Sequence, residues 1–121
     1  MSVSRFEVQP DAALTPFELT SREAFTTDDK TEINHFYHQY YGQSDDQSRL
    51  AGVWECAPCR EEIKSYPVDE MMTVVAGSVT VTEAGKPAAT FVAGDTFFIA
   101  KGTECIWHIT ETLRKFYFIA G

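Results

Sequence analysis

The pattern of apolar and polar positions changes near the middle of the chain. Residues 1–50 are polar and irregular, whereas residues 51–119 are dense in Val, Ile, Phe, Thr, Tyr and Trp, interrupted by Gly and Pro. Short runs of β-branched and aromatic residues with such breakers are typical of strands. We predict strands at Ala51–Cys56, Glu61–Tyr66, Glu70–Val75, Ser78–Glu83, Ala88–Val92, Thr96–Ile99, Cys105–Ile109 and Leu113–Ile119.

The connections between these runs are too short for crossover helices. Breakers such as Ala84-Gly85-Lys86-Pro87 and Gly94-Asp95 leave room only for tight turns, so the strands must be mostly antiparallel. This predicts an all-β sandwich or barrel with at most one short helix. Apolar groups on both faces, as in Phe97-Phe98-Ile99, require cover from the opposite sheet and the N-terminal segment, or from a second subunit.

The stretch Ile33–Tyr41 is rich in aromatic residues without a helical period. We predict an extended strand that lies on the barrel and could extend a sheet edge. We also predict a homodimer, in which this stretch or the two-faced apolar strands are buried between subunits.

Length and charge narrow the class of protein. A chain of 121 residues is expected to form one domain, with residues 1–50 as an N-terminal extension with covering strands and 51–119 as the barrel core. Its net charge of −8 repels phosphate backbones and anionic lipids, so neither a nucleic acid nor a membrane is an expected partner. The chain starts without an apolar leader and has three cysteines, which predicts a cytoplasmic protein with free thiols.

Two spaced motifs resemble those of the cupin superfamily. Glu70-x6-Gly77, followed by Gly94-Asp95-x4-Ala100-Lys101-Gly102, is similar to the family patterns G-x5-H-x-H-x3,4-E-x6-G and G-x5-P-x-G-x2-H-x3-N. The segments Gly52–Pro58 and Tyr66–Glu70 resemble the cupin_3 family, which is related to the cupin domains of (S)-ureidoglycine aminohydrolase and of an ethanolamine-utilisation protein. The resemblance implies a cupin-type (RmlC-like) antiparallel double-sheet β-barrel, or jelly roll.

The resemblance also locates the positions at which cupins bind a metal. Two His and a Glu of the first motif and a His of the second correspond to Lys64, Tyr66, Glu70 and Cys105. An ammonium group repels a cation and a protonated phenol is a poor ligand, which leaves Glu70 and Cys105 as weak candidates. Two protein ligands do not make a tight divalent site. We therefore expect neither the usual cupin metal nor another cofactor.

The same four side chains could form a mixed polar cluster in one cavity. Strand alternation puts Lys64 and Tyr66 on one face, and Lys64 beside Glu70 would favour the ionised form of both. Such a cluster, with Cys105, can hold a polar or anionic small molecule, or transfer a proton through Glu70 or Tyr66. The alternative is a satisfied Lys–Glu pair in a relict cavity.

Aromatic residues supply candidate walls for that cavity. Trp107 shares the face of Cys105, and Tyr117 is a further candidate for the ligand pocket, whereas Trp54 is expected to pack in the core. His108 is one residue out of phase and should point away from the cavity.

Two further signals are weak. Cys56-Ala-Pro-Cys59 lacks the second pair that a zinc site needs and the helix that follows a redox motif, so structural thiols are the simpler interpretation. His35 and His38 would face opposite sides of a strand, which favours surface or interface roles over a metal site.

These observations favour a small-molecule-binding cupin of unassigned activity. One alternative is an enzyme acting on a small nitrogenous or carboxylate metabolite, as the resemblance to ureidoglycine aminohydrolase implies. Another is a structural or regulatory accessory domain. Ligands recruited from the N-terminal segment would favour the enzyme, and a filled cavity would favour the accessory domain.

Overall fold

The computed structural model of the chain describes residues 3–6, 9, 12–16, 36–46 and 48–121. These residues form strands and turns, and none of them belongs to a helix that could span a bilayer. All strand pairings in this part of the chain are antiparallel, which confirms the predicted all-β class. The strands are β1 (Thr15–Pro16), β2 (Phe36–Gln43), β3 (Arg49–Cys56), β4 (Cys59–Ile63), β5 (Asp69–Glu83), β6 (Ala89–Val92), β7 (Thr96–Ile99) and β8 (Cys105–Ala120).

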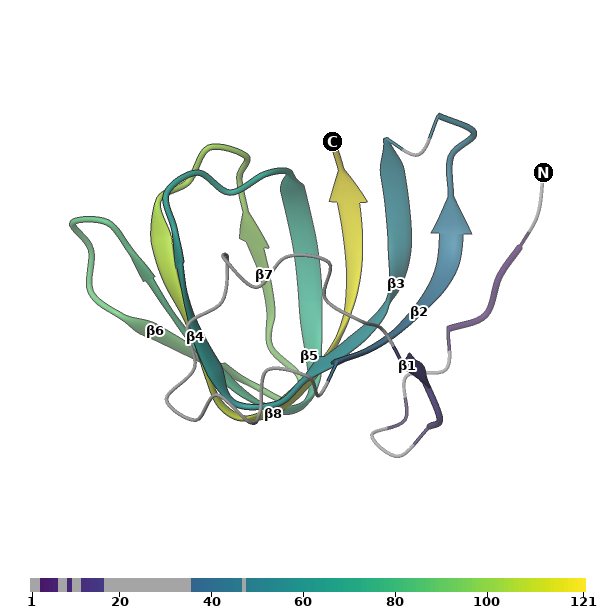
Figure 1. The fold of residues 1–121 in the computed structure, drawn as a ribbon, viewed down its shortest axis with the longest axis horizontal. Helices are drawn as coiled ribbons and strands as arrows, with labels where there is room; N and C mark the ends of the chain where they lie inside the picture. The colour runs from purple at the N-terminus through teal and green to yellow at the C-terminus, as the bar shows by residue number, and fades with distance from the viewer. Residues whose placement is uncertain (1–2, 7–8, 10–11, 17–35, 47) are drawn as a thin grey trace.

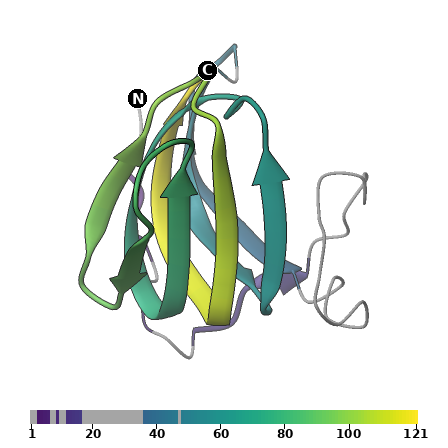
Figure 2. The same ribbon diagram turned by 90° about the vertical axis from the view of Figure 1, so that its left-hand side faces the viewer.

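The two long strands β5 and β8 each belong to two sheets. Residues 69–76 of β5 and 113–120 of β8 pair in what we call the large sheet, with the order β1-β2-β3-β8-β5-β7. Residues 78–83 of β5 and 105–111 of β8 continue into the small sheet, with the order β4-β8-β5-β6. Figure 1 shows both strands curving from one sheet into the other. Strands β4 and β6, on the left of Figure 1, face the viewer in Figure 2.

This continuity corrects part of the sequence prediction. Glu70–Val75 and Ser78–Glu83 were predicted as separate strands, as were Cys105–Ile109 and Leu113–Ile119, but each pair is one strand. The ladder between β5 and β8 shifts register between Val74 and Val79 instead of ending there. A glycine signals a bulge as readily as a turn, so the sequence alone did not distinguish the two.

Gly77 is the residue that allows this bend. Its φ is +79°, a region that favours glycine, and a Cβ there would overlap the backbone carbonyl of Thr112 on β8. On the next rung, the hydroxyls of Ser78 and Thr110 share a hydrogen bond across the two strands. The two strands are therefore held together at the bend by close backbone packing at Gly77 and by the hydrogen bond between Ser78 and Thr110.

The predicted edge strand in the N-terminal half is partly confirmed. Strand β2 pairs with β3 along its length and includes the predicted residues 36–41, whereas Ile33, Asn34 and His35 lie outside the described residues. Because β3 pairs in turn with β8, β1 and β2 extend the large sheet.

The outer face of the large sheet is partly covered by residues near the N-terminus. The Arg114 guanidinium donates through Nη1 to the carbonyls of Gln9 (2.8 Å) and Ala12 (2.7 Å), and through Nε to Glu55 (3.1 Å). Phe6 packs against the ring of Phe116 at a centroid distance of 6.3 Å. These contacts hold Phe6, Gln9 and Ala12 against β8.

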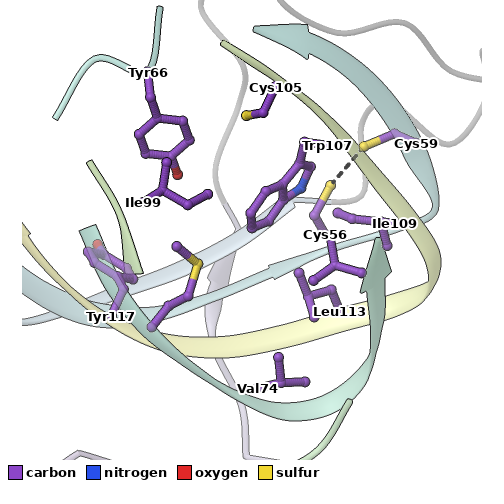
Figure 3. Packing of buried hydrophobic residues seen from close by; sticks show 12 residues of the cluster. Cys56, Cys59, Tyr66, Val74, Ile99, Cys105, Trp107, Ile109, Leu113 and Tyr117 are labelled. Atoms are coloured by element: carbon purple, nitrogen blue, oxygen red, sulfur yellow. Dashed lines mark hydrogen bonds between the residues drawn. The ribbon is translucent and has the colours of Figure 1, made fainter. Parts of the chain in front are cut away.

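The hydrophobic core lies between the two sheets and receives side chains from both (Figure 3). Burying aliphatic and aromatic groups of this size contributes roughly 1.5–3 kcal/mol for each side chain. The core residues are Cys56, Cys59, Tyr66, Met72, Val74, Val79, Ile99, Cys105, Trp107, Ile109, Leu113 and Tyr117.

Candidate functional site

A buried polar network lies in the interior of the barrel. The Glu70 carboxylate accepts a hydrogen bond from Tyr66 Oη at Oε1 (2.7 Å) and from Lys115 Nζ at Oε2 (2.7 Å). The side chains of Lys115 and Glu70 are only 7% and 6% exposed. A carboxylate and an ammonium at this depth stabilise the fold only when they are paired, because removal of either leaves an uncompensated charge. We call Tyr66, Glu70 and Lys115 the interior triad.

Aromatic rings surround the ammonium group of the triad. Lys115 Nζ lies 4.7 Å from the ring centroid of Trp54, 4.8 Å from that of Trp107 and 5.9 Å from that of Tyr117. These distances are within the range of cation–π attraction, which is strongest where water is excluded. The rings therefore replace part of the hydration that Lys115 loses on burial.

The predicted pairing of Lys64 with Glu70 is wrong. Lys64 is exposed, and Lys115 takes the place expected for it. Strand β4 was predicted at Glu61–Tyr66 but ends at Ile63, and the bend at Lys64 and Ser65 interrupts the alternation of side chains. Tyr66 is turned inward again by backbone hydrogen bonds with Thr103 and Gly102, each 2.8 Å long.

The other predicted pocket residues do lie in the interior. Tyr66, Glu70, Cys105, Trp107 and Tyr117 are all buried, and Figure 3 shows Tyr66, Trp107 and Tyr117 together between the sheets. Whether they contact a ligand stays a prediction. Trp54, predicted as a core residue, is half-buried and faces Lys115.

Sequence reasoning missed two ionisable residues of the interior, Lys115 and Glu61. Lys115 has the same parity along β8 as Trp107 and Tyr117, so alternation alone could have placed it inside. Glu61 pairs in register with Trp107 on the inner face of the small sheet. Alternation counted back from Tyr66 would put Glu61 on the outer face, and the bend at Lys64 and Ser65 reverses that assignment.

The Glu61 carboxyl has a raised pKa, and its hydrogen bonding differs from that of Glu70. Burial raises the pKa of its carboxyl from 4.5 to about 7, although the positive charge of Lys115 opposes the shift. Within the described part of the chain, its carboxyl makes no hydrogen bond or ion pair. A half-buried carboxyl in this state can take up or release a proton near neutral pH.

Tyr66 and Cys105, two other titratable groups of the interior, stay protonated at neutral pH. Burial, followed by the charge of Glu70, raises the pKa of the Tyr66 hydroxyl above its ordinary value. Burial, followed by the charge of Glu61, raises the pKa of the Cys105 thiol. Of these three groups, Glu61 is therefore the one best suited to gain or lose a proton near pH 7.

The interior does not fit the metal that metal-binding cupins hold. Both oxygens of Glu70 already accept hydrogen bonds, and one of the donors is a cation. Among the described residues, no three His, Cys, Asp or Glu side chains are grouped so as to hold an ion. An ammonium beside the expected carboxylate ligand repels a divalent cation, so this chemistry does not suit a metal centre.

The cysteines and histidines add little to the site. Cys56 and Cys59 are buried thiols with their Sγ atoms 3.8 Å apart, and their shared hydrogen bond, together with burial, raises the pKa of Cys56. The alternation of β8 places His108 on the outer face beside Arg60 and Thr80, as predicted. The side chains of His35 and His38 lie outside the described residues.

A hollow at the β6–β7 end of the barrel lies near the interior triad. Its volume is about 350 Å³, and its lining includes Phe91, Phe97 and Ile99. Ile99 is the strand neighbour of Glu70, and the Phe97 ring packs 6.1 Å from that of Trp107. A small molecule in this hollow would be separated from the interior by these two side chains.

Comparisons with known proteins agree with this geometry. The model of the EutQ-like cupin domain family matches residues 43–117. No curated protein matches the chain.

Solved structures with the same fold include two bacterial proteins. A putative ethanolamine utilization protein Q from Salmonella typhimurium LT2 is 20% identical, with a TM-score of 0.61 over 90% of this chain and 98% of that one. A DUF861-family protein of unknown function from Pseudomonas syringae pv. tomato is 23% identical, with a TM-score of 0.73 over 95% of this chain but only 46% of that one.

Proposed function

Because this chain belongs to the EutQ-like cupin family, we propose that it binds a small molecule in the cupin interior without the usual cupin metal. We further propose that the ligand carries an amino group or another strong hydrogen-bond donor, which Glu61 accepts. Trp107, beside Glu61 on the adjacent strand, would provide the apolar wall.

The observation that supports this proposal is the unequal state of the two interior carboxyls. Glu70 is neutralised by Lys115 and Tyr66, whereas Glu61 has no hydrogen-bond donor among the described residues. With Glu61 ionised, the group formed by Glu61, Glu70 and Lys115 carries one net negative charge, which favours a cationic ligand over an anionic one. This choice departs from the anionic ligand considered for the Lys64–Glu70 pair, since Lys64 is exposed.

An enzyme acting on a small nitrogenous metabolite is the second candidate. It is favoured by the raised pKa of Glu61, about 7, because a general acid or base works best when its pKa is near the operating pH. A structural or regulatory accessory domain is the third candidate, and the absence of any ligand would favour it. In all three cases we propose a single domain that acts in the cytoplasm as a homodimer.

Calorimetric titration with a panel of small amines, amidines, ureido compounds and carboxylates tests the proposal. We expect an amine or ureido compound to bind, and Glu61→Gln to weaken its affinity about ten-fold or more, as loss of a charge-assisted hydrogen bond does. Arg60→Gln, next to Glu61 on β4 but on the outer face opposite His108, is the matched control and should leave the affinity unchanged. Selective binding of carboxylates, or equal loss in both variants, would contradict this function.

A further inference from the structure

An exposed apolar row crosses the outer face of the large sheet. Phe98 on β7, Met71 on β5 and Phe118 on β8 are register neighbours, and their side chains are 60%, 50% and 45% exposed. Phe6 packs on the adjacent rung at Phe116, whereas these three side chains are open to solvent. A row of this kind on a sheet face marks a contact surface.

The same row continues into small residues on the other side of Phe118. Phe118 pairs with Ala51 on β3, and Ala51 pairs with Gly42 on β2. A Cβ on Gly42 would lie 3.6 Å from the Cβ of Ala51, so both positions open onto the same face. The row therefore has large side chains on the side of β8 where β5 and β7 lie, which we call the bulky side. It has small residues on the side where β3 and β2 lie, which we call the low side.

The next rung carries opposite charges on the same two sides. Asp69 on β5 and Arg49 on β3 both pair with Ala120 on β8, and both are exposed. The Asp69 carboxylate is held by the backbone amide of Lys101 at 2.8 Å. The acidic residue thus lies on the bulky side and the basic residue on the low side.

We propose that two copies of this chain pack through this face about a two-fold axis that runs parallel to β8 above Phe118. This axis exchanges the two sides of β8, so that Met71 lies over the partner subunit's Ala51 and Phe98 over the partner's Gly42. It also brings Asp69 opposite the partner's Arg49. After this two-fold rotation, large side chains of one copy face small residues of the other, and opposite charges face each other. An isologous interface requires this self-complementarity.

The inference rests on the proposed homodimer and deepens it, but it does not depend on the proposed ligand. Phe118 lies on the axis, so Phe118→Cys should place two introduced thiols against each other. Treatment with diamide should then yield a disulfide-linked dimer on a non-reducing gel. Thr90→Cys, exposed on the outer face of the small sheet, is the matched control and should stay monomeric on the gel, because the native cysteines are buried.

A charge exchange tests the orientation. Asp69→Arg and Arg49→Asp should each weaken the dimer about three-fold to ten-fold in sedimentation equilibrium, and the double exchange should restore it. A monomeric wild type at micromolar concentration, or a dimer that neither cross-links at position 118 nor recovers in the double exchange, would overturn the inference. Met71→Lys should give a folded monomer, and amine binding by that monomer would show that the ligand proposal stands independently of the dimer.

Discussion

Lys115 on β8 and Glu70 on β5 form an ion pair that sequence spacing does not suggest. Lys115 is a register neighbour of Val74, and Glu70 is a register neighbour of Ile119, yet Nζ lies 2.7 Å from Oε2. The long lysine side chain runs along the inner face of the large sheet to reach the carboxylate, and the rings of Trp54 and Trp107 lie beside the ammonium. The ion pair thus forms only when β5 and β8 are paired in the folded barrel.

Removal of the Glu70 charge should destabilise the protein strongly. Glu70→Gln leaves the Lys115 ammonium buried without a counter-charge, so we expect urea denaturation to show a loss of about 3–5 kcal/mol in the free energy of unfolding. The double variant Glu70→Gln with Lys115→Met should lose less than the sum of the single changes, because it also removes the stranded cation. Lys64→Gln should change stability by less than about 0.5 kcal/mol. Equal effects at Lys64 and Glu70 would contradict the pairing.

Glu61 should make stability depend on pH. Its pKa is raised from 4.5 to about 7 in the folded state, so the folded protein holds a proton that the unfolded chain releases between these values. The free energy of unfolding therefore falls as pH rises from about 4.5 to about 7. Because Glu61 is only half-buried, we expect a contribution of about 1–2 kcal/mol.

The variant Glu61→Gln isolates this contribution. Urea denaturation at pH 5 and pH 8 gives the free energy of unfolding of both proteins. The value for the variant, relative to that of the wild type, should be higher at pH 8 than at pH 5. Affinity of the wild type for a cationic ligand should rise over the same range, because Glu61 then carries its charge. A difference between the two proteins that does not change with pH would show that Glu61 titrates normally.

Gly77 should tolerate no side chain. Gly77→Ala would force a Cβ into the carbonyl of Thr112 while φ remains at +79°, so we expect a loss of at least about 2 kcal/mol. Gly94 also has a positive φ of 94°, but nothing lies within 4 Å of the position of its Cβ. Gly94→Ala should therefore lose only about 1 kcal/mol. Thermal melts of the two variants measure the difference directly.

Metal content provides a further check on the interior. Since Lys115 and Tyr66 occupy both oxygens of Glu70, we expect the purified protein to hold well under one equivalent of manganese, iron, nickel or zinc by elemental analysis. Exhaustive chelation should leave the melting temperature unchanged. Stoichiometric metal that disappears in Glu70→Gln would refute this interpretation of the site.

The fold could be predicted from the sequence further than the site could. Turn residues such as Gly94-Asp95 and the alternation around Trp107 depend on local chemistry, so most strand positions and their antiparallel pairing could be derived from the chain alone. The family resemblance then supplied the barrel. The joining of two predicted strands at Gly77 was missed because a bulge and a turn use the same residue type.

The partner of Glu70 could not be derived in the same way. Lys64 was the lysine at the family's motif position, but one bend before Tyr66 turned it outward. Lys115 lies 45 residues from Glu70 in the chain and reaches it only because β5 and β8 are adjacent. A contact of this kind depends on which strands are neighbours, which local patterns do not encode.

Arg114 and Lys115 are consecutive residues that point to opposite faces of one strand. Arg114 binds the carbonyls of Gln9 and Ala12 outside the sheet, while Lys115 binds Glu70 inside. Since side chains alternate with a period of two, deleting one residue of the bulged segment at Thr110–Thr112 would exchange the two cations. The guanidinium would enter the barrel and the ammonium would face solvent. A change in the length of β8 would therefore exchange the inner and outer faces of the strand beyond the deletion, whereas a substitution alters one position on one face.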